Sequence, residues 1–468
     1  MIFHPKELVP KEGRFVFKGE VKASLSPALH KPVFHELWQG FTFGLSTLAA
    51  SPSDGCVFTV GEAVLIEPVD CDYTVNIEPH GICVCARDEK NLIRGFFTLL
   101  DRFYVVQTET GDALAADCCQ IKDSADIQNR MIHYCVFAET ELWEVKRFLR
   151  LCAALKYTHV VLEFWGMLKY DAMKELSWQH AFTKEQFRPL VREARELGLE
   201  LVPMFNLWGH ASAARVMHGK HVVLDQNPSL QTYFSEDGWC WNIQSEKVQA
   251  LLRQVREELL ELCGEGAYFH IGCDEAYNFD FNEESMQALI DYINGVSAEM
   301  MAKGRRVLMW GDMLLYRHGH YNPKNRYTCN APTPDAERFF LARLSRDIVI
   351  ADWQYRAPEA PVETCAVFRV AGFDCILCPW DEGRAQIDAA LSTVKEQKLM
   401  GYMHTTWHTL TAGMPYVTLM GVGGYENIEG YSIVKASPQT AALLRKVMPA
   451  GGDYEKAGWA KFDVGCRW

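Results

Sequence analysis

The chain has 468 residues, 49% of them hydrophobic, a net charge of -13 and no lysine- or arginine-rich run. This composition is typical of a globular protein, and the acidic balance argues against nucleic acid as a partner, because phosphate backbones are bound by clustered Lys and Arg. No stretch approaches the roughly eighteen apolar residues of a membrane-spanning helix, so we expect no membrane partner. The length predicts two domains, one of them large.

The beginning of the chain lacks a basic segment followed by an apolar one, so we expect no signal peptide. Sixteen cysteines occur without the regular spacing of a disulfide framework. In an oxidising compartment so many thiols would risk mispairing, and we therefore expect a cytoplasmic protein. The one CxxC, at 375–378, lies in a strand-like run without a second pair, which favours a structural role over zinc binding.

The first part of the chain, from about residue 14 to 120, contains short apolar runs followed by one helical segment. The clearest runs are CVFTV at 56–60, YTVNIE at 73–78 and GICVCA at 81–86, and the helical segment covers 88–105. Several strands with one helix at their end favour a small α+β domain, which we place at residues 1–122.

From residue 130 onward, short apolar runs alternate with amphipathic helical segments. The runs are 130–137, 159–165, 199–205, 267–272, 306–310, 347–353, 373–379 and 401–407. Eight such β/α units predict a (β/α)8 TIM barrel, which we place at 123–440, with 441–468 as a tail packed on it. The expected fold class is therefore α/β, a TIM barrel preceded by the small α+β domain, with an open doubly wound sheet as the alternative.

The helical segments between the runs support this organisation. Thr183 and Gln186 form a capping-box signature at the start of 183–198. An apolar face follows with helical spacing, made of Phe187, Leu190, Val191 and Ala194. The connection at 206–244 is long for a barrel loop, and long loops of this kind are usually functional.

Barrel enzymes carry their catalytic groups at the C-terminal ends of the strands. At those ends this sequence gathers carboxylates, histidines and tryptophans, together with one asparagine. They are Glu163, Trp165, Asn206, Trp208, His210, His270, Asp274, Glu275, Trp310, Asp312, Asp352, Trp353, Trp380, Asp381, Glu382, Trp407 and His408. Aromatic rings stack on the apolar face of a sugar and acids act on its glycosidic oxygen, so the pattern predicts carbohydrate chemistry.

One motif carries a family resemblance. HIGCDE at 270–275 resembles the H-x-G-G-D-E signature of glycoside hydrolase family 20, the β-N-acetylhexosaminidases, with Cys273 in place of the second glycine. RGFFTLLD at 94–101 resembles the helix closing that family's N-terminal domain, and VPMFNLWGHAS at 202–212 resembles the segment that carries its active-site histidine, here His210. MWGDM, ADW and TTW are similar to the family's three acetamido-pocket tryptophans, which gives Trp310, Trp353 and Trp407.

The resemblance implies an exo-acting, retaining β-N-acetylhexosaminidase in which the substrate's own 2-acetamido oxygen is the nucleophile. Such an intramolecular nucleophile can be worth about 7–11 kcal/mol when its geometry is right. Glu275 would be the acid/base, while Asp274 would orient the acetamide N–H and stabilise the oxazolinium intermediate. The charge of Asp274 would also help to keep Glu275 protonated. The implied substrates are short oligosaccharides or glycoconjugates with a terminal N-acetylhexosamine, and no cofactor or metal is implied.

The same resemblance assigns further residues to the site. Arg130 falls where the family has an arginine that holds the sugar's O3 and O4, and Glu163 is the best stand-in for the aspartate that supports His210. Asp312 and Trp380 are further candidates for substrate contacts.

Two positions depart from the family pattern. The tyrosine that bonds the acetamide oxygen is missing after strand seven, where CPWDEG leaves Asp381 or Glu382 to bind a hydroxyl. After the last tryptophan, His408 stands where the family often has a glutamate.

Two other functions stay open. The missing tyrosine and the altered acid after strand two are consistent with a catalytically silent sugar-binding barrel. A metal-dependent hydrolase could use His133, His210, His270 and Asp274, although the H-x-H spacing of many such enzymes is absent. The sequence decides neither the terminal sugar, the linkage nor the oligomeric state.

Overall fold

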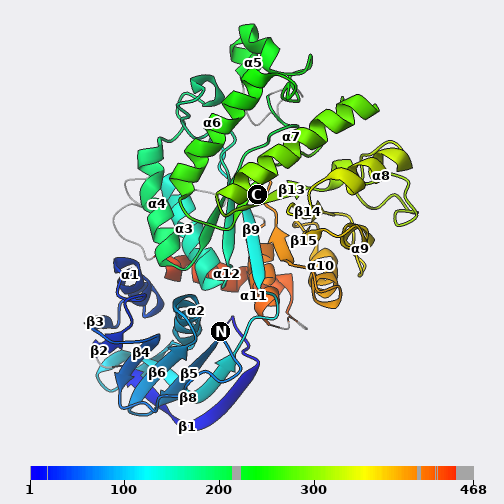
Figure 1. Ribbon diagram of the computed structural model, residues 1–468. Coiled ribbons are helices and arrows are strands. Elements are labelled where there is room, and N and C mark those ends of the chain that lie inside the picture. The colour runs from blue at the N-terminus through cyan, green and yellow to red at the C-terminus, as the bar shows by residue number, and fades with distance from the viewer. Residues whose placement is uncertain are drawn as a thin grey trace.

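The structure, a computed structural model, describes residues 2–17, 19–212, 223–407, 413–426, 428 and 431–448. It places an N-terminal sheet unit at one end of a closed parallel barrel (Figure 1). Strand β9 (Asn129–Cys135) pairs with both β10 (His159–Glu163) and β16 (Gly401–His404), so the ring is complete. The predicted TIM barrel with a preceding α+β unit is confirmed, and the open-sheet alternative is wrong.

The N-terminal unit is a mixed sheet with two helices. In spatial order its strands are β1 (Glu7–Phe17), β8 (Gly111–Asp123), β5 (Tyr73–Glu78), β6 (Gly81–Ala86), β4 (Val57–Gly61), β2 (Glu20–Leu25) and β3 (Thr47–Pro52), with β7 (Tyr104–Thr108) paired to β8. Helix α2 (Glu89–Leu100) packs on β5 and β6, and α1 (Pro32–Phe41) packs on β3. The sheet ends one short connection before β9, and the exact domain limits that we predicted remain proposals.

The barrel strands are short, parallel and buried. Those between β10 and β16 are β11 (Glu200–Met204), β12 (Tyr268–His270), β13 (Arg306–Trp310), β14 (Val349–Trp353) and β15 (Asp374–Cys378). All five residues of β10 are buried, as expected for a parallel strand that is covered by side chains inside and helices outside. A layer of alternate residues fills the interior, among them Met131, Val161, Val202, Leu308, Val349 and Ile376.

Helices cover the outside of the barrel. They are α3 (Leu142–Ala154), α4 (Lys184–Glu196), α6 (Glu246–Cys263), α7 (Glu283–Ala302), α8 (Pro334–Arg343), α9 (Glu363–Val370), α10 (Arg384–Glu396), α11 (Met414–Tyr425) and α12 (Ile433–Val447). The connections carry the short helix α5 (Val223–Gln226) and 3-10 turns at Lys174–Leu176, Pro228–Tyr233 and Asp312–Leu314. The predicted capping box of α4 is present, because Thr183 and Gln186 each accept the other's backbone N–H. The predicted apolar face of α4 is buried.

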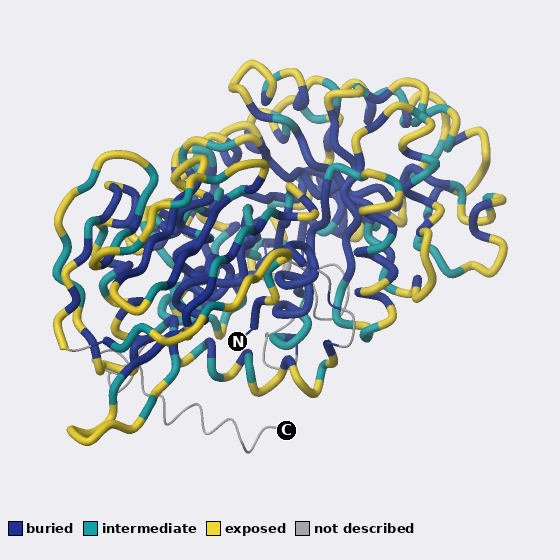
Figure 2. Tube along the Cα trace, turned by 90° about the horizontal axis from the view of Figure 1, so that it is seen from below, coloured by how far each residue is buried: buried dark blue, intermediate teal, exposed yellow. Residues whose placement is uncertain are grey.

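Buried segments run through the middle of both the sheet unit and the barrel (Figure 2). In the part of the chain that the structure describes, no helix is both long and apolar enough to cross a bilayer. The predicted tail falls partly on α12, which packs against α1 and α3. Residues 449–468 lie outside the described ranges.

A buried charged cluster, the junction cluster, joins the sheet unit to the amino end of the barrel. Lys156 lies between α3 and β10, and its Nζ donates to the Tyr73 hydroxyl at 2.7 Å. The same atom lies 3.5 Å from Asp123 Oδ2 and 4.0 Å from Glu426 Oε1. It also sits 4.0 Å from the ring centroid of Tyr425, a cation–π contact. One cation therefore faces two buried carboxylates from different parts of the chain.

Candidate active site

The two adjacent acids follow β12 on a tightly bent backbone. Gly272, Cys273 and Glu275 have φ angles of 64°, 74° and 50°, in the left-handed region. A Cβ on Gly272 would lie 2.1 Å from Asn206 Oδ1, so only glycine fits there. Cys273 occupies the position of the second glycine in the motif, and a non-glycine residue in this region costs about 1–2 kcal/mol. Strain of this kind persists where the surrounding structure holds it, and it clusters at functional sites.

A histidine lies between the two carboxylates. His210 Nε2 is 3.3 Å from Asp274 Oδ2 and 3.2 Å from Glu275 Oε2. Asp274 is only 5% exposed and accepts a hydrogen bond of 3.1 Å from Asn206 Nδ2. The side chain of Glu275 is 28% exposed, and one of its oxygens accepts from the Tyr277 hydroxyl. One acid is thus buried and fixed, while its neighbour reaches the open side of the site.

A third carboxylate, that of Asp312, bonds to the backbone of the acid pair. Asp312 Oδ2 accepts the backbone N–H of Glu275 at 3.0 Å and an amide N–H of Asn330 at 2.8 Å. Its Oδ1 accepts from Trp353 Nε1 at 3.1 Å. Burial, and next the nearby charge of Asp274, raise the pKa of Asp312 to about 7. We predicted that Asp312 binds substrate, but it is 1% exposed and its oxygens bond to the protein, so its position fits a residue that holds Glu275 in place.

The predicted tryptophans gather with a tyrosine that the sequence analysis missed. Trp310 is fully buried, and its ring lies 5.8 Å from that of Trp407. The indole N–H of Trp407 donates to the Tyr355 hydroxyl at 2.6 Å. The ring of Tyr355 also contacts those of Trp353 and Trp380, with distances of 5.0 and 5.4 Å between ring centroids. The signal for Tyr355 was its spacing of two from Trp353, because alternate residues of an extended segment share a face.

The long connection after β11 supplies a second aromatic residue that we did not predict. Trp239 donates from its indole N–H to the backbone oxygen of Glu275 at 2.7 Å. Its ring lies 4.3 Å from that of His210. Gly209 lets this loop approach the acids, since a Cβ there would lie 2.1 Å from the backbone oxygen of Asp274.

Two of the predicted site residues have other partners. Arg130 lies at the amino end of β9, fully buried, and donates to the backbone oxygens of Ile127 and Lys156 at 2.6 and 2.8 Å. The prediction that it binds the sugar is wrong, because the acids lie at the opposite end of the barrel. Glu163 does not take the predicted role beside His210 either. It pairs with His133, at 3.0 Å between Oε2 and Nε2.

The remaining predicted positions are placed as follows. Trp380 and Asp381 directly follow β15, partly buried, and their contacts with a substrate remain predictions. His408 lies outside the described residues. Among the described residues, the four ligands suggested for a metal-dependent hydrolase do not meet. His210 groups with the two acids, whereas His133 groups with Cys135 and Glu163.

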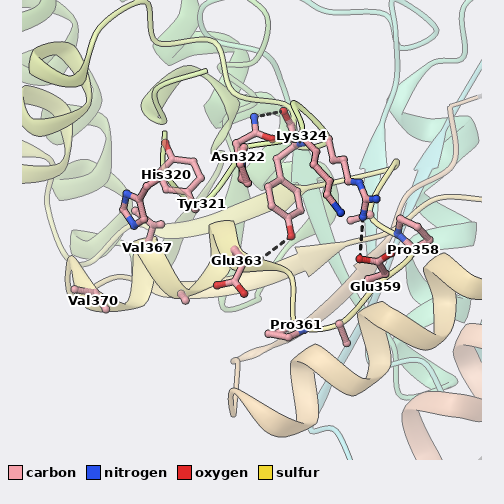
Figure 3. Close-up of a pocket in the computed structure, with 16 residues that line it drawn as sticks. His320, Tyr321, Asn322, Lys324, Pro358, Glu359, Pro361, Glu363, Val367 and Val370 are labelled. Carbon is pink, nitrogen blue, oxygen red and sulfur yellow. Dashed lines mark hydrogen bonds and ion pairs between the residues drawn. The ribbon is translucent and has the colours of Figure 1, made fainter. Parts of the chain in front are cut away.

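A cavity of about 620 Å³ lies beside α9 and is separate from these residues (Figure 3). Its walls come from 320–327 and 357–370. The backbone N–H of Glu363 donates to the Tyr327 hydroxyl at 3.2 Å, and Arg326 pairs with Glu359 at 2.9 Å. None of the acids or tryptophans described above lines this cavity.

Comparisons with known proteins agree with this geometry. Residues 158–382 match the family described as "Glycosyl hydrolase family 20, catalytic domain". Hexosaminidase D of Bos taurus is 25% identical over 178 residues, which are 35% of this chain and 49% of that protein. The chain thus matches about half the length of this curated relative.

Solved structures extend the likeness to nearly the whole chain. The exo-β-N-acetylglucosaminidase of Vibrio harveyi, solved with N-acetylglucosamine, gives a TM-score of 0.65 at 15% identity, covering 95% of this chain and 77% of that one. A mutant of the Streptomyces plicatus β-hexosaminidase, solved with the product GlcNAc, gives a TM-score of 0.66 at 14% identity and covers 95% and 94%. At these identities the likeness establishes the fold.

Proposed function

We propose that the chain is a member of glycoside hydrolase family 20 and an exo-acting, retaining β-N-acetylhexosaminidase, because residues 158–382 match that family's catalytic domain. It would remove a terminal β-linked N-acetylhexosamine by substrate-assisted catalysis. The observation that carries the proposal is the pair of adjacent acids, one buried and one open, that share His210. Retaining glycosidases that lack a substrate nucleophile need two carboxyl groups about 5 Å apart across the sugar. Here a single acid can suffice.

Glu275 is the acid/base of this mechanism. In the first step the acetamido oxygen attacks the anomeric carbon, the glycosidic C–O bond breaks, and the carboxyl proton of Glu275 passes to the leaving oxygen. In the second step the carboxylate of Glu275 takes a proton from water, whose oxygen adds to the anomeric carbon and opens the oxazolinium ring. The partial exposure of Glu275 supports this role, since it must reach both the leaving group and water.

Asp274 orients and stabilises the acetamide. It accepts the acetamide N–H, which places the acetamido oxygen for attack, and its charge balances the positive charge of the oxazolinium. Because Asn206 and His210 hold both of its oxygens, the carboxylate does not have to reorganise when charge develops.

Tyr355 takes the place of the tyrosine that is missing after β15. Its oxygen accepts the Trp407 N–H, and its proton would turn from Thr405, its other hydrogen-bond partner, to the acetamido oxygen when substrate binds. Burial raises the pKa of Tyr355 well above its usual value, and the nearby charges of Cys378 and Asp274 add to the rise. A hydroxyl that stays protonated is the donor that this position needs.

The remaining parts of the proposal concern the substrate and the location. Short oligosaccharides or glycoconjugate fragments, a cytoplasmic location and the absence of a required cofactor stay as predicted from the sequence. They rest on the cysteine content and on the family resemblance.

The test compares hydrolysis of aryl β-GlcNAc and aryl β-GalNAc, each with and without a thiazoline mimic of the oxazolinium. Turnover that the thiazoline blocks competitively would support both the activity and the neighbouring-group mechanism, and the ratio of the two sugars gives the specificity. Thiazoline binding without turnover of either sugar would instead favour a barrel that only binds. Turnover that is insensitive to the thiazoline would contradict the mechanism.

A further inference from the structure

Three unlike ligand groups meet at the ends of β9 and β10. His133 Nε2 lies 3.0 Å from Glu163 Oε2, and Cys135 Sγ lies 3.7 Å from each of these atoms. All three side chains are buried. The strand geometry explains the cluster, because His133 and Cys135 alternate on one face of β9 and Glu163 pairs in register with Cys135.

We propose that His133, Cys135 and Glu163 form a binding site for Zn²⁺. Zinc binds imidazole nitrogen, thiolate sulfur and carboxylate oxygen at about 2.0–2.3 Å, so ligand atoms around a tetrahedral ion lie about 3.3–3.7 Å apart. The three observed separations are within a few tenths of an ångström of that range. A soft sulfur in the set favours zinc over magnesium or calcium. Three protein ligands leave the fourth position to water.

A neighbouring indole supports the sulfur as a ligand. Trp165 Nε1 donates to Cys135 Sγ at 3.1 Å, so the sulfur acts as a hydrogen-bond acceptor. Such a donor stabilises a thiolate relative to a thiol. This contact is independent of the three-residue cluster and points to the same chemistry.

The proton balance of binding is defined by the contacts. Nε2 of His133 carries the proton that is shared with Glu163, and Nδ1 accepts from the Thr406 N–H at 3.5 Å. When the ion binds, the thiol proton of Cys135 leaves to solvent and the imidazole proton moves from Nε2 to Nδ1. The long Thr406 contact is then lost. One proton is released for each ion bound.

An ion at this site would inhibit the proposed reaction. The His133 ring lies 4.5 Å from the ring of Trp407 and 6.3 Å from that of Trp310, at the floor of the tryptophan group. Binding of Zn²⁺ with release of one proton makes the cluster more positive by one charge, which disfavours the positive charge that develops on the oxazolinium. Only this inhibitory consequence rests on the proposed function; the zinc site itself does not.

Binding is measured on the full chain, reduced with a phosphine rather than a thiol. Calorimetric titration with Zn²⁺ in two buffers of different protonation enthalpy should give one ion and about one released proton. Co²⁺ should give a near-ultraviolet thiolate charge-transfer band. Cys135→Ser should abolish the band and weaken Zn²⁺ binding more than about 100-fold. This is a larger loss than removal of a residue that only hydrogen-bonds to a ligand would cause. Cys152→Ser, another buried thiol, is the matched control and should change neither.

A second variant and a competing site complete the test. Glu163→Gln should weaken Zn²⁺ binding while keeping the cobalt–sulfur band, provided that circular dichroism shows a folded protein. Binding that survives Cys135→Ser but disappears in His210→Asn would place the ion at the acid pair and overturn the proposal. Absence of stoichiometric binding by the wild-type protein would overturn it as well, whether or not the protein hydrolyses hexosaminides. Stoichiometric binding by a protein whose zinc-free form hydrolyses no hexosaminide would leave the zinc site standing and count against the proposed function.

Discussion

The barrel carries a cluster of charged groups at each end, and the two clusters differ in how their positive and negative charges balance. At the amino end, Lys156 faces Asp123 and Glu426 and packs on aromatic rings. At the carboxyl end, Asp274 and its neighbouring acid share a histidine, which is charged only when it is protonated. Removing one partner of a buried ion pair leaves the other charge buried and uncompensated, which is strongly destabilising. The cluster at the amino end therefore holds the sheet unit and the barrel together. Two like charges held close together lower the stability of the fold, so the cluster at the carboxyl end indicates a function.

The backbone shows the same contrast. Lys156 also has a left-handed φ, of 63°, but it directly follows the end of α3, where such a residue commonly closes a helix. His210 and Glu275, at 57° and 50°, close no helix. The contacts of the active site hold these two strained conformations, and strain held in this way indicates a functional role.

The largest expected effect comes from Glu275→Gln. Loss of the acid should lower kcat for substrates with poor leaving groups by about 10²–10⁴-fold, while binding of the thiazoline mimic is retained. The melting temperature should stay the same or rise, because one of two like charges is removed. Steady-state kinetics and thermal unfolding measure both. Wild-type turnover, or a large fall in melting temperature, would contradict the functional reading of this end.

The opposite outcome is expected at the junction cluster. Lys156→Ala leaves Asp123 and Glu426 buried without their cation, which should lower the free energy of unfolding by about 3–5 kcal/mol. Activity at temperatures where the variant is folded should be unchanged. The control is Lys146→Ala on α3, whose partly exposed ion pair with Glu193 should contribute less than about 1 kcal/mol. Urea unfolding of both variants measures the two losses in free energy of unfolding. Equal losses would show that the junction cluster adds no stability of its own.

The barrel, and the location of the two acids after one of its strands, could be predicted from the sequence because both signals are local. Alternating strands and helices, the capping box and the HIGCDE motif each lie within a few residues of one another. Arg130 was misplaced because the resemblance outweighed its position at the start of a strand, which puts it at the amino end. Trp239 was missed because only the folded loop returns it to Glu275. The partner of Glu163 depended on strand register, which composition does not encode.

Asp274→Asn tests the division of labour within the acid pair. The amide keeps the size of the side chain but removes the charge that balances the oxazolinium, so kcat should fall by about 10²-fold. Affinity for the thiazoline, whose protonated form a carboxylate at position 274 would stabilise, should fall with it, whereas Glu275→Gln should leave that affinity intact. Competitive inhibition constants for the two variants measure the difference. Equal affinities would mean that the charge of Asp274 does not act on the intermediate.

The smallest expected effect is a change in pH dependence that both ends of the barrel share. Burial raises the pKa of Asp312 from 3.8, and that of Glu426 from 4.5, to about 7. Between the unfolded and folded values the native state holds a proton that the unfolded chain has lost, so stability should fall as pH rises through this window. Asp312→Asn and Glu426→Gln should each remove part of that fall, measured as urea midpoints at about pH 5 and pH 8. An unchanged pH slope in either variant would contradict the raised pKa of that carboxyl.

Asp312→Asn and Glu426→Gln should differ in their effect on activity. Asp312 Oδ2 accepts the backbone N–H of Glu275, and an asparagine there can keep that bond only by turning its amide N–H₂ toward the indole N–H of Trp353, which is also a donor. The pH profile of kcat should therefore change in Asp312→Asn and stay as in the wild type in Glu426→Gln. The same titration then acts on chemistry at one end of the barrel and on stability alone at the other. A change in the kcat profile of Glu426→Gln would mean that the two ends are coupled.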